Sequence, residues 1–185
     1  MAKGRIILKN IKFQLTIERL CNQLIEEYGN FDNTCIVGIQ ERGVLLSDRI
    51  VSVLYSIDKN FAFKYGKVDI TFYRDDFRRR DTPLMASNTE MDFQVENSQV
   101  ILIDDVLYTG RTIQSGLIAL GHYGRPAKVE LLTLVDRRFN RHLPIQPNYA
   151  GMVIDAIDEA YVKVEWDEID TKDQVLLYQN REAAT

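Results

Sequence analysis

The sequence predicts an α/β fold in which a mainly parallel central sheet is flanked by helices. Short apolar runs at residues 35–39, 100–104 and 128–136 suit strands that are buried on both faces. Amphipathic helical patterns separate these runs, and strands that alternate with helices at this spacing are typical of a parallel sheet. At 185 residues and 45% hydrophobic composition the chain can bury one substantial core, so we expect a single domain spanning residues 1–185.

The predicted elements follow from periodicity and from the residues that punctuate it. Leu20, Leu24 and Tyr28 share one helical face, and Gly29 follows as a terminator. The β-branched and aromatic run "VDITFY" favours a strand. In chain order, we expect a helix at 15–29, a strand at 35–39, a helix at 43–57, a strand at 68–73, a strand at 100–104, a helix at 112–124 and a strand at 128–136.

Two further segments are expected to flank the main sheet. Residues 74–99 show no convincing helix or strand pattern, and a connection of this length in a compact domain is usually functional. We therefore expect a flexible lid at about 74–99, although the charges of "FRRRD" (77–81) are equally compatible with a solvated surface. Short strand-like pieces at about 149–180 are expected to form the C-terminal part of a small flap, or hood.

Composition excludes several classes of function. A net charge of −4 argues against a generally basic nucleic-acid-binding protein, but not against a local basic face. Cys21 and Cys35 lie in apolar patterns that are typical of buried free thiols in a reducing compartment. Without a transmembrane-length apolar run or a signal-peptide pattern, we expect a cytoplasmic protein. His122 and His142 are the only histidines, which leaves little for a Ser-His triad or a histidine metal site.

The segment "VILIDDVLYTGRT" (100–112) carries the strongest chemical signal. A helix that begins near Gly110 directs its free N–H groups and positive dipole end at the preceding loop. Thr109 and Thr112 add hydroxyl donors, and together these features predict a phosphate site. The segment lacks the G-x-x-x-x-G-K-[ST] pattern, which disfavours a P-loop nucleotidase.

The adjacent acids, Asp104 and Asp105, indicate what else the ligand carries. Carboxylates would repel a phosphate, but they accept hydrogen bonds from hydroxyl groups a few ångströms further along the same ligand. A ribose 5-phosphate has this layout. Capping of the following helix is the structural alternative, and it accounts for one aspartate but not for both. Loops 38–43, 104–106 and 136–138 each follow a strand, so we expect them to meet at one edge of the sheet.

These residues resemble the phosphoribosyl diphosphate signature of the type I phosphoribosyltransferases. The resemblance extends over nearly the whole chain to one subgroup, the bifunctional pyrimidine operon (pyr) attenuation regulators and uracil phosphoribosyltransferases. The segments that carry it are "GIQERGVLL", "VDITFYRDD", "VILIDDVLYTGRT", "LLTLVDRR", "LPIQPNYAG" and "WDEID". It implies the type I phosphoribosyltransferase fold and the reaction of uracil with phosphoribosyl diphosphate (PRPP), giving uridine monophosphate (UMP) and pyrophosphate. It also implies Mg²⁺ carried by PRPP, with no direct protein ligand to the metal.

The resemblance assigns a role to each site residue. Asp104 and Asp105 are expected to hold the ribose hydroxyls, and one of them to accept a proton. The residues implied to wrap the 5-phosphate are Val106, Leu107, Tyr108, Thr109, Gly110, Arg111 and Thr112. The implied pyrophosphate loop is Glu41, Arg42 and Gly43, and the implied start of the flexible loop is Tyr73, Arg74, Asp75 and Asp76. Arg137 and Val162 are the implied nucleobase contacts, with Tyr161 as a rival to Val162.

The chain departs from the subgroup's pattern at two places. Glu41 stands where the pyrophosphate loop commonly has Thr or Ser, and an acid there is unfavourable unless it points away or meets Mg²⁺. Attenuation regulators bind a pyr messenger-RNA leader on a basic dimer surface, and for that role the candidates here are Arg19, Arg138 and Arg141. Glu18, Gln146 and Met152 stand where such regulators tend to present hydroxyl or basic groups.

Three functions therefore stay open from the sequence. The first is a uracil phosphoribosyltransferase, with or without UMP-dependent RNA regulation. The second is an RNA-binding attenuation regulator with weak or vestigial catalysis, and the third is a phosphoribosyltransferase for another base. The resemblance also implies a homodimer or a higher homo-oligomer. For this the apolar segment "GRIILKNIKFQL" (4–15) is a candidate contact, unless it packs on the chain's own sheet.

Overall fold

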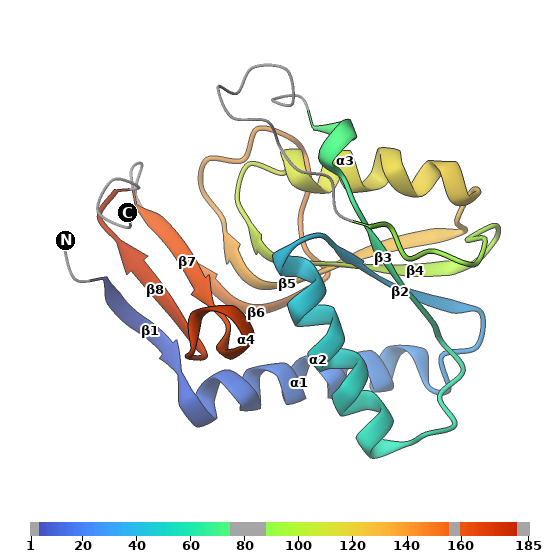
Figure 1. Cartoon of the computed structure of the whole chain (residues 1–185), viewed down its shortest axis with the longest axis horizontal. Helices are drawn as coiled ribbons and strands as arrows, with labels where there is room; N and C mark the ends of the chain where they lie inside the picture. Colours follow the sequence, from blue (N-terminus) through green and yellow to red (C-terminus); the bar gives the residue numbers. More distant parts are fainter. Residues whose placement is uncertain (1–3, 75–87, 156–159, 181–185) are drawn as a thin grey trace.

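A five-stranded parallel sheet forms the centre of the protein (Figure 1). The structure is a computed structural model that describes residues 4–74, 88–155 and 160–180. In spatial order the strands are β3 (Lys64–Val68), β2 (Thr34–Ile39), β4 (Gln99–Leu107), β5 (Lys128–Arg137) and β6 (Tyr149–Ile154). The chain runs from β2 to β3 on one side and then continues through β4 on the other. The boundary between β2 and β4 is therefore the topological switch point, where ligands bind in sheets of this kind.

Helices cover both faces of this sheet. α1 (Asn10–Tyr28) and α2 (Arg42–Ile57) lie on one face, and α3 (Arg111–Leu120), followed by the short turn η2 (Gly121–Tyr123), lies on the other (Figure 1). Each face has its own hydrophobic cluster. Strand β4 contributes Ile101 and Ile103 to the first cluster, and Val100 and Leu102 to the second. This alternation follows from the two-residue period of a strand, and burial on both sides explains why the strand is apolar throughout.

A second, antiparallel sheet forms the hood beside the main sheet (Figure 1). It contains β1 (Arg5–Lys9), β8 (Gln174–Tyr178) and β7 (Tyr161–Glu165) in that order, and α4 (Asp167–Asp170) connects β7 to β8. β1 pairs with β8, so the two ends of the described chain meet in the hood. The N-terminal strand thus packs on the chain's own sheet.

The predicted strand at residues 68–73 is wrong. β3 ends at Val68, and Thr71–Tyr73 forms a turn of 3₁₀-helix, η1. The Asp69 carboxylate accepts hydrogen bonds from the Thr71 backbone N–H at 2.9 Å and from the Thr71 hydroxyl at 2.6 Å. Such a local side-chain to backbone bond competes with a strand ladder and turns the chain away from the sheet. The β-branched and aromatic residues of this segment indicated a strand, but the strand β3 lies earlier in the chain, at Lys64–Val68.

The predicted start of the hood, at residue 149, is also wrong. Tyr149–Ile154 is β6, the edge strand of the main sheet, and it pairs in parallel with β5. The sequence pattern identified a strand here but not the sheet that it joins. Within the described residues, the C-terminal part of the hood consists of β7, α4 and β8.

The interval predicted as a lid is only partly described. Its last part packs on the domain, since Glu90 bridges to Lys67 of β3 and Val95 is buried in the second cluster. Residues 75–87, which include Asp75, Asp76 and the 77–81 charges, lie outside the described residues. The boundaries of a lid therefore remain a prediction.

Two simpler expectations can be compared directly with the structure. Cys21 and Cys35 are free and buried, as predicted. Among the described residues, no helix has both the length and the apolar character needed to cross a membrane.

Candidate active site

The paired acids lie at the carboxyl end of β4, beside the switch point. The strand continues to Leu107. Asp104 and Asp105 therefore belong to the last four residues of the strand and not to the following loop. Their exposed fractions are only 7% and 9%. The Asp105 backbone N–H donates to Asp104 Oδ1 at 3.0 Å, which fixes one carboxylate relative to the strand. The apolar run before them therefore holds two carboxylates at fixed positions on the sheet edge.

Burial makes both carboxylates reluctant to ionise. Desolvation raises the pKa of Asp105 to about 6, against the opposing effect of the positive Arg42. Desolvation and the neighbouring Asp105 charge raise the pKa of Asp104 well above its usual range, while Arg74 counteracts them. Two carboxyl groups with displaced pKa values at a sheet edge are what acid-base or charge-stabilising chemistry requires.

The loop after β2 comes into direct contact with the acids. A side chain at Gly43 would place its Cβ 2.7 Å from the Ile103 carbonyl oxygen and 3.0 Å from Asp104 Cα, so only glycine allows α2 to begin this close to β4. Arg42 donates through Nη1 to the Val164 carbonyl at 2.6 Å and to Asp170 Oδ2 at 3.2 Å. Arg42 is thereby held between the loop and the hood.

The loop from Tyr108 to Thr112 presents an open helix N-terminus. Gly110 precedes α3 with φ +91°, a left-handed conformation that favours glycine, and α3 has no side-chain cap. An uncapped N-terminus leaves backbone N–H groups and the positive end of the helix dipole available to an anion. This geometry suits an anion such as a phosphate.

The segment between β5 and β6 supports this loop from outside. Arg141 donates to the Tyr108 carbonyl, and to Asp136 Oδ1 at 2.5 Å. The His142 backbone N–H donates to the Thr109 carbonyl at 3.0 Å. The shape of the 108–112 loop thus depends on residues more than thirty positions later in the chain.

Two cavities meet at the acids. The first, of 430 Å³, lies under the hood. It is lined by Arg42, Arg74, Asp105, Val106, Tyr108, Arg137, Ala160, Tyr161, Val162, Lys163 and Val164. The second, of 310 Å³, lies over the sheet edge, and its lining includes Glu41, Asp69, Asp104 and Thr112. Because both are also lined by Arg42, Arg74, Asp105 and Val106, they form one continuous cleft.

The hood side of the cleft contains the residues expected near a base. Arg137 is part of β5 instead of the loop after it, and its guanidinium lies 3.7 Å from the centre of the Tyr108 ring. Its Nε has no hydrogen-bond partner among the described residues, and burial lowers the pKa of its guanidinium. Val162 is 5% exposed and lines the cavity together with its rival Tyr161.

Some predicted site residues do not reach the cleft. Leu107 is 1% exposed and packs in the second hydrophobic cluster, so its side chain cannot wrap a phosphate. The centres of the Tyr73 and His122 rings lie 5.5 Å apart, and the Tyr73 carbonyl accepts a hydrogen bond from the Ser115 hydroxyl. Arg74, by contrast, does reach the cleft and lines both cavities.

The arginines predicted for RNA contact all have partners within the chain. Arg19 donates to the Ala150 and Gly151 carbonyls of β6. Arg138 forms an exposed two-pronged pair with Asp155, whereas Arg141 is only 15% exposed in its contact with Asp136. Arg141 thus supports the 108–112 loop from within the chain, which the local sequence did not indicate.

Sequence reasoning also missed part of the cleft wall. Ala160, Lys163 and Val164 line the first cavity, and Asp69 and Thr71 line the second. The alternation of buried and part-buried residues in "YVKVE" was the available signal for a hood strand with one face on the site. Nothing local in the sequence pointed to Asp69, because its role depends on where β3 ends.

The fold and the cleft together define an α/β domain with a polar cleft at the switch point of a parallel sheet. Residues 5–169 match the phosphoribosyl transferase domain. "Bifunctional protein PyrR" from Microcystis aeruginosa is 43% identical over 171 residues, covering 92% of this chain and 95% of that protein. "Bifunctional protein PyrR" from Bacillus subtilis is 36% identical over 183 residues, covering 97% and 99%.

Solved structures agree on the fold. The hypoxanthine phosphoribosyltransferase of Trypanosoma cruzi superimposes with a TM-score of 0.70 at 14% identity, covering 95% of this chain and 96% of that one. A hypoxanthine phosphoribosyltransferase from Staphylococcus aureus gives a TM-score of 0.66 at 18% identity, covering 93% and 90%. The chain belongs to the phosphoribosyl transferase family, in the group of the bifunctional PyrR proteins.

Proposed function

We propose that the protein transfers the ribose 5-phosphate group of PRPP to uracil and releases pyrophosphate, with UMP as the product. One observation carries this proposal: the paired acids of β4 and the open N-terminus of α3 lie on one continuous cleft. The acids suit sugar hydroxyls and the helix end suits a phosphate. Membership of the phosphoribosyl transferase family supports the same assignment.

The chain's own residues divide the PRPP molecule between them. Backbone N–H groups at the start of α3, with the Thr109 and Thr112 hydroxyls, bind the 5-phosphate. Asp104 and Asp105 accept hydrogen bonds from the ribose hydroxyls. As the anomeric bond breaks, positive charge develops on the ring, and ionised carboxylates held at the sheet edge stabilise it more than they stabilise the ground state.

The leaving pyrophosphate is assigned to the second cavity. Arg42 and Arg74 line it and supply positive charge, and the close approach of Gly43 sets the position of the loop. In the described ranges, no three His, Cys, Asp or Glu side chains converge on a common metal position. Mg²⁺ would arrive on the diphosphate, as the sequence resemblance implies, and would supply charge neutralisation there.

The base is assigned to the cavity under the hood. Tyr161 and Val162 form its hood wall, and Arg137 on Tyr108 forms the opposite wall. The Arg137 Nε–H, buried without a partner among the described residues, is a donor suited to a carbonyl oxygen of the base. We assign uracil and not a purine as the base because of the sequence resemblance. The solved structural neighbours named above are hypoxanthine phosphoribosyltransferases.

Release of pyrophosphate with a panel of bases tests this function. With PRPP and Mg²⁺, we expect uracil to support release, and hypoxanthine, guanine and adenine to support it far more weakly. The control is the same mixture without a base. Release with a purine alone would replace the assigned substrate, and no release with any base would overturn the enzymatic assignment.

RNA binding is a second candidate because the relatives are called bifunctional. Arg19 and Arg138 are exposed and could contact phosphates, although each already has a partner in the chain. A mobility shift with a pyr leader RNA, with and without UMP at a stated salt concentration, separates the two functions. A UMP-dependent shift together with silent catalysis would favour a regulator, and catalysis without a shift would favour an enzyme alone.

We also propose that the chain assembles as a homodimer or a larger homo-oligomer. Exposed apolar side chains on α1 support this, since Ile11 is 72% exposed and Leu15 is 53% exposed. Burial of such residues against a second copy would remove an unfavourable contact with water.

A further inference from the structure

Trp166 is a buried aromatic residue whose polar atom has no partner in the part of the chain that the structure describes. It follows β7 directly and has no exposed surface. Phe13 packs edge-on against its ring, with the ring centres 5.3 Å apart, and the Arg49 guanidinium lies 5.1 Å from its ring centre. Among the described residues, its Nε1–H has no acceptor within standard hydrogen-bond geometry. A buried donor in this state is costly to maintain and calls for an explanation.

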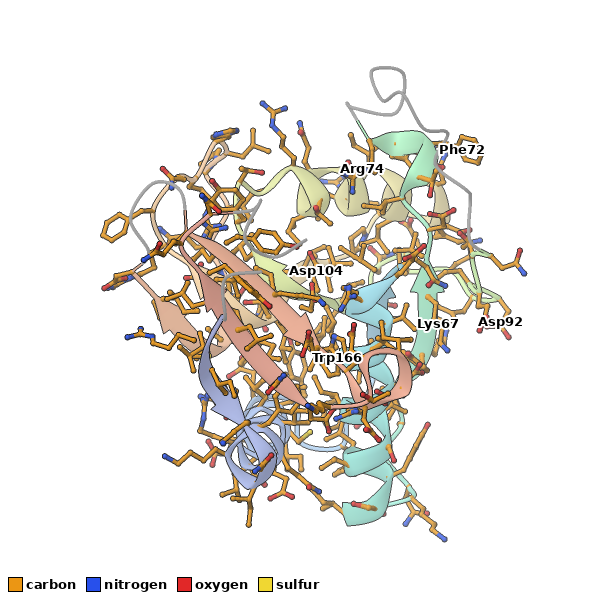
Figure 2. All side chains as sticks on the ribbon, turned by 60° about the vertical axis from the view of Figure 1, so that its left-hand side comes forward. Lys67, Phe72, Arg74, Asp92, Asp104 and Trp166 are labelled. Atoms are coloured by element: carbon orange, nitrogen blue, oxygen red, sulfur yellow. The ribbon has the colours of Figure 1, made fainter. Side chains whose placement is uncertain are left out.

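The Asp105 carboxylate is the candidate acceptor for this donor, because the Trp166 indole interacts with it electrostatically. The Arg42 charge opposes the rise in the Asp105 pKa that burial causes, and the Val106 N–H and the Trp166 indole act in the same direction. Figure 2 shows Trp166 where the hood meets the main sheet, near the end of β4 that carries Asp104. Asp105 and Val164, two residues before Trp166, line the same cavity.

The turn at α4 holds Trp166 and Arg42 together. Asp170 Oδ2 accepts the Trp166 backbone N–H at 3.1 Å and Arg42 Nη1 at 3.2 Å. Arg49 of α2 donates hydrogen bonds to Glu168 and Asp173 at 2.7–3.0 Å and so links the same part of the hood to α2. The two groups from outside β4 that act on Asp105 are thus positioned by one short segment of the hood.

We propose that Trp166 is a positioning residue for phosphoribosyl transfer, whose indole N–H holds the Asp105 carboxylate in the orientation that accepts a ribose hydroxyl. Its consequence for catalysis rests on the proposed function, whereas the interaction between Trp166 and Asp105 does not. The hood then does more than cover the base, because it also orients a carboxylate on the main sheet. A purely structural role would need the indole ring but not its N–H.

Trp166 is the only tryptophan in the chain, so its fluorescence can report on Asp105. Other charged groups border the same cleft, namely Arg42, Arg74, Asp104, Arg137 and Lys163, with Glu41 and Asp69 across the second cavity. Among them Asp104, whose pKa is raised, must be controlled for. We expect the emission of the full-length protein to change with pH around a midpoint of about 6.

Matched variants identify the group responsible for the change. In Asp105→Asn the step near pH 6 should disappear, whereas Asp104→Asn should retain a step. A step that survives unchanged in Asp105→Asn, or no step in the wild-type protein, would overturn the proposal. Because this measurement needs no substrate, its failure leaves the proposed function standing. Absent pyrophosphate release would overturn the proposed function without touching the titration.

Kinetic measurements distinguish a role of the indole N–H from a role of the aromatic ring. Trp166→Phe keeps an aromatic ring and removes the donor, so the acid limb of kcat/KM for PRPP should move to higher pH. Phe13→Leu loosens the same aromatic contact and keeps the donor, so it should lower thermal stability and leave that limb in place. Equal pH profiles for the two variants would assign Trp166 to packing alone and overturn the proposal.

Discussion

Replacement of Asp105 by asparagine should lower the turnover number at least ~10-fold, as loss of a contact made in the transition state does. The substitution keeps the size of the side chain and removes its negative charge. Asp105 lines both cavities and lies where positive charge develops on the ribose ring. Asparagine can still hydrogen-bond a hydroxyl, so the Michaelis constant for PRPP should change less than turnover.

Steady-state kinetics with uracil and PRPP measure this effect. Asp92→Asn is the matched control, because Asp92 is exposed and lies outside the two cavities of the cleft. The control should retain wild-type turnover. Near wild-type turnover in Asp105→Asn itself would remove this carboxylate from the catalytic role.

The same variant should be more stable than the wild-type protein at neutral pH. Burial raises the pKa of Asp105 from 3.8 to about 6, so between these values the folded state binds a proton more tightly than the unfolded chain does. Ionisation of Asp105 therefore costs stability, and this cost is absent below about pH 4 and complete above about pH 6. Asparagine avoids it, so the free energy of unfolding at pH 7 should rise by about 1–3 kcal/mol.

Urea unfolding at several pH values checks the sign. The difference in unfolding free energy between variant and wild type should grow from near zero at about pH 4 to a plateau above about pH 6. Taking the difference cancels most of the titration of the other carboxyl groups. A difference that shrinks as pH rises would mean that the folded state favours the ionised form of Asp105.

Replacement of Gly43 by alanine should damage both stability and catalysis. The added Cβ would lie 2.7 Å from the Ile103 carbonyl oxygen and 3.0 Å from Asp104 Cα, and both of these are backbone atoms that cannot rotate away. The start of α2 must move off β4, at a cost of about 1–3 kcal/mol for overpacking. Because the contact is at Asp104, a shift of about 1 Å should reduce kcat/KM on the order of 100-fold.

Gly121→Ala supplies the control for this substitution. An added Cβ there would have no neighbour within 4 Å in the described part of the chain, and the residue already has helical dihedral angles. Its thermal midpoint and kinetics should match those of the wild-type protein. If Gly43→Ala behaved like Gly121→Ala, the close approach of α2 to the acids would not be required for the site.

The parts of the fold that the sequence predicted are those governed by local pattern. The apolar runs of β2, β4 and β5 are continuous because both faces of the sheet are covered, and the strands were placed correctly for that reason. "DDVLYTGRT" indicated a sugar-phosphate site because each residue type has a separate chemical reason to be there. The parallel arrangement then brought the loop after β2 to the same edge.

The parts that were missed depend on long-range pairing. Whether Tyr149–Ile154 joins the hood or the main sheet depends on which edge is unpaired, and local sequence does not state this. The turn at Asp69 replaced a strand because one side-chain bond competed with the ladder. Nothing in the local sequence singled out Trp166, because its burial against Phe13 depends on how the hood packs on α1.

The central claim is that the acids of β4 and the N-terminus of α3 share one ligand, with the hydroxyls at the acids and the phosphate at the loop. Equilibrium binding of UMP, 2′,3′-dideoxy-UMP and uridine to the wild-type protein and to Asp104→Ala/Asp105→Ala tests it directly. Removing the hydroxyls should weaken wild-type binding about tenfold, as loss of hydrogen bonds to carboxylates does, and should have little effect in the variant. Removing the phosphate should weaken binding equally in both. An equal penalty for the missing hydroxyls in the two proteins would contradict the account.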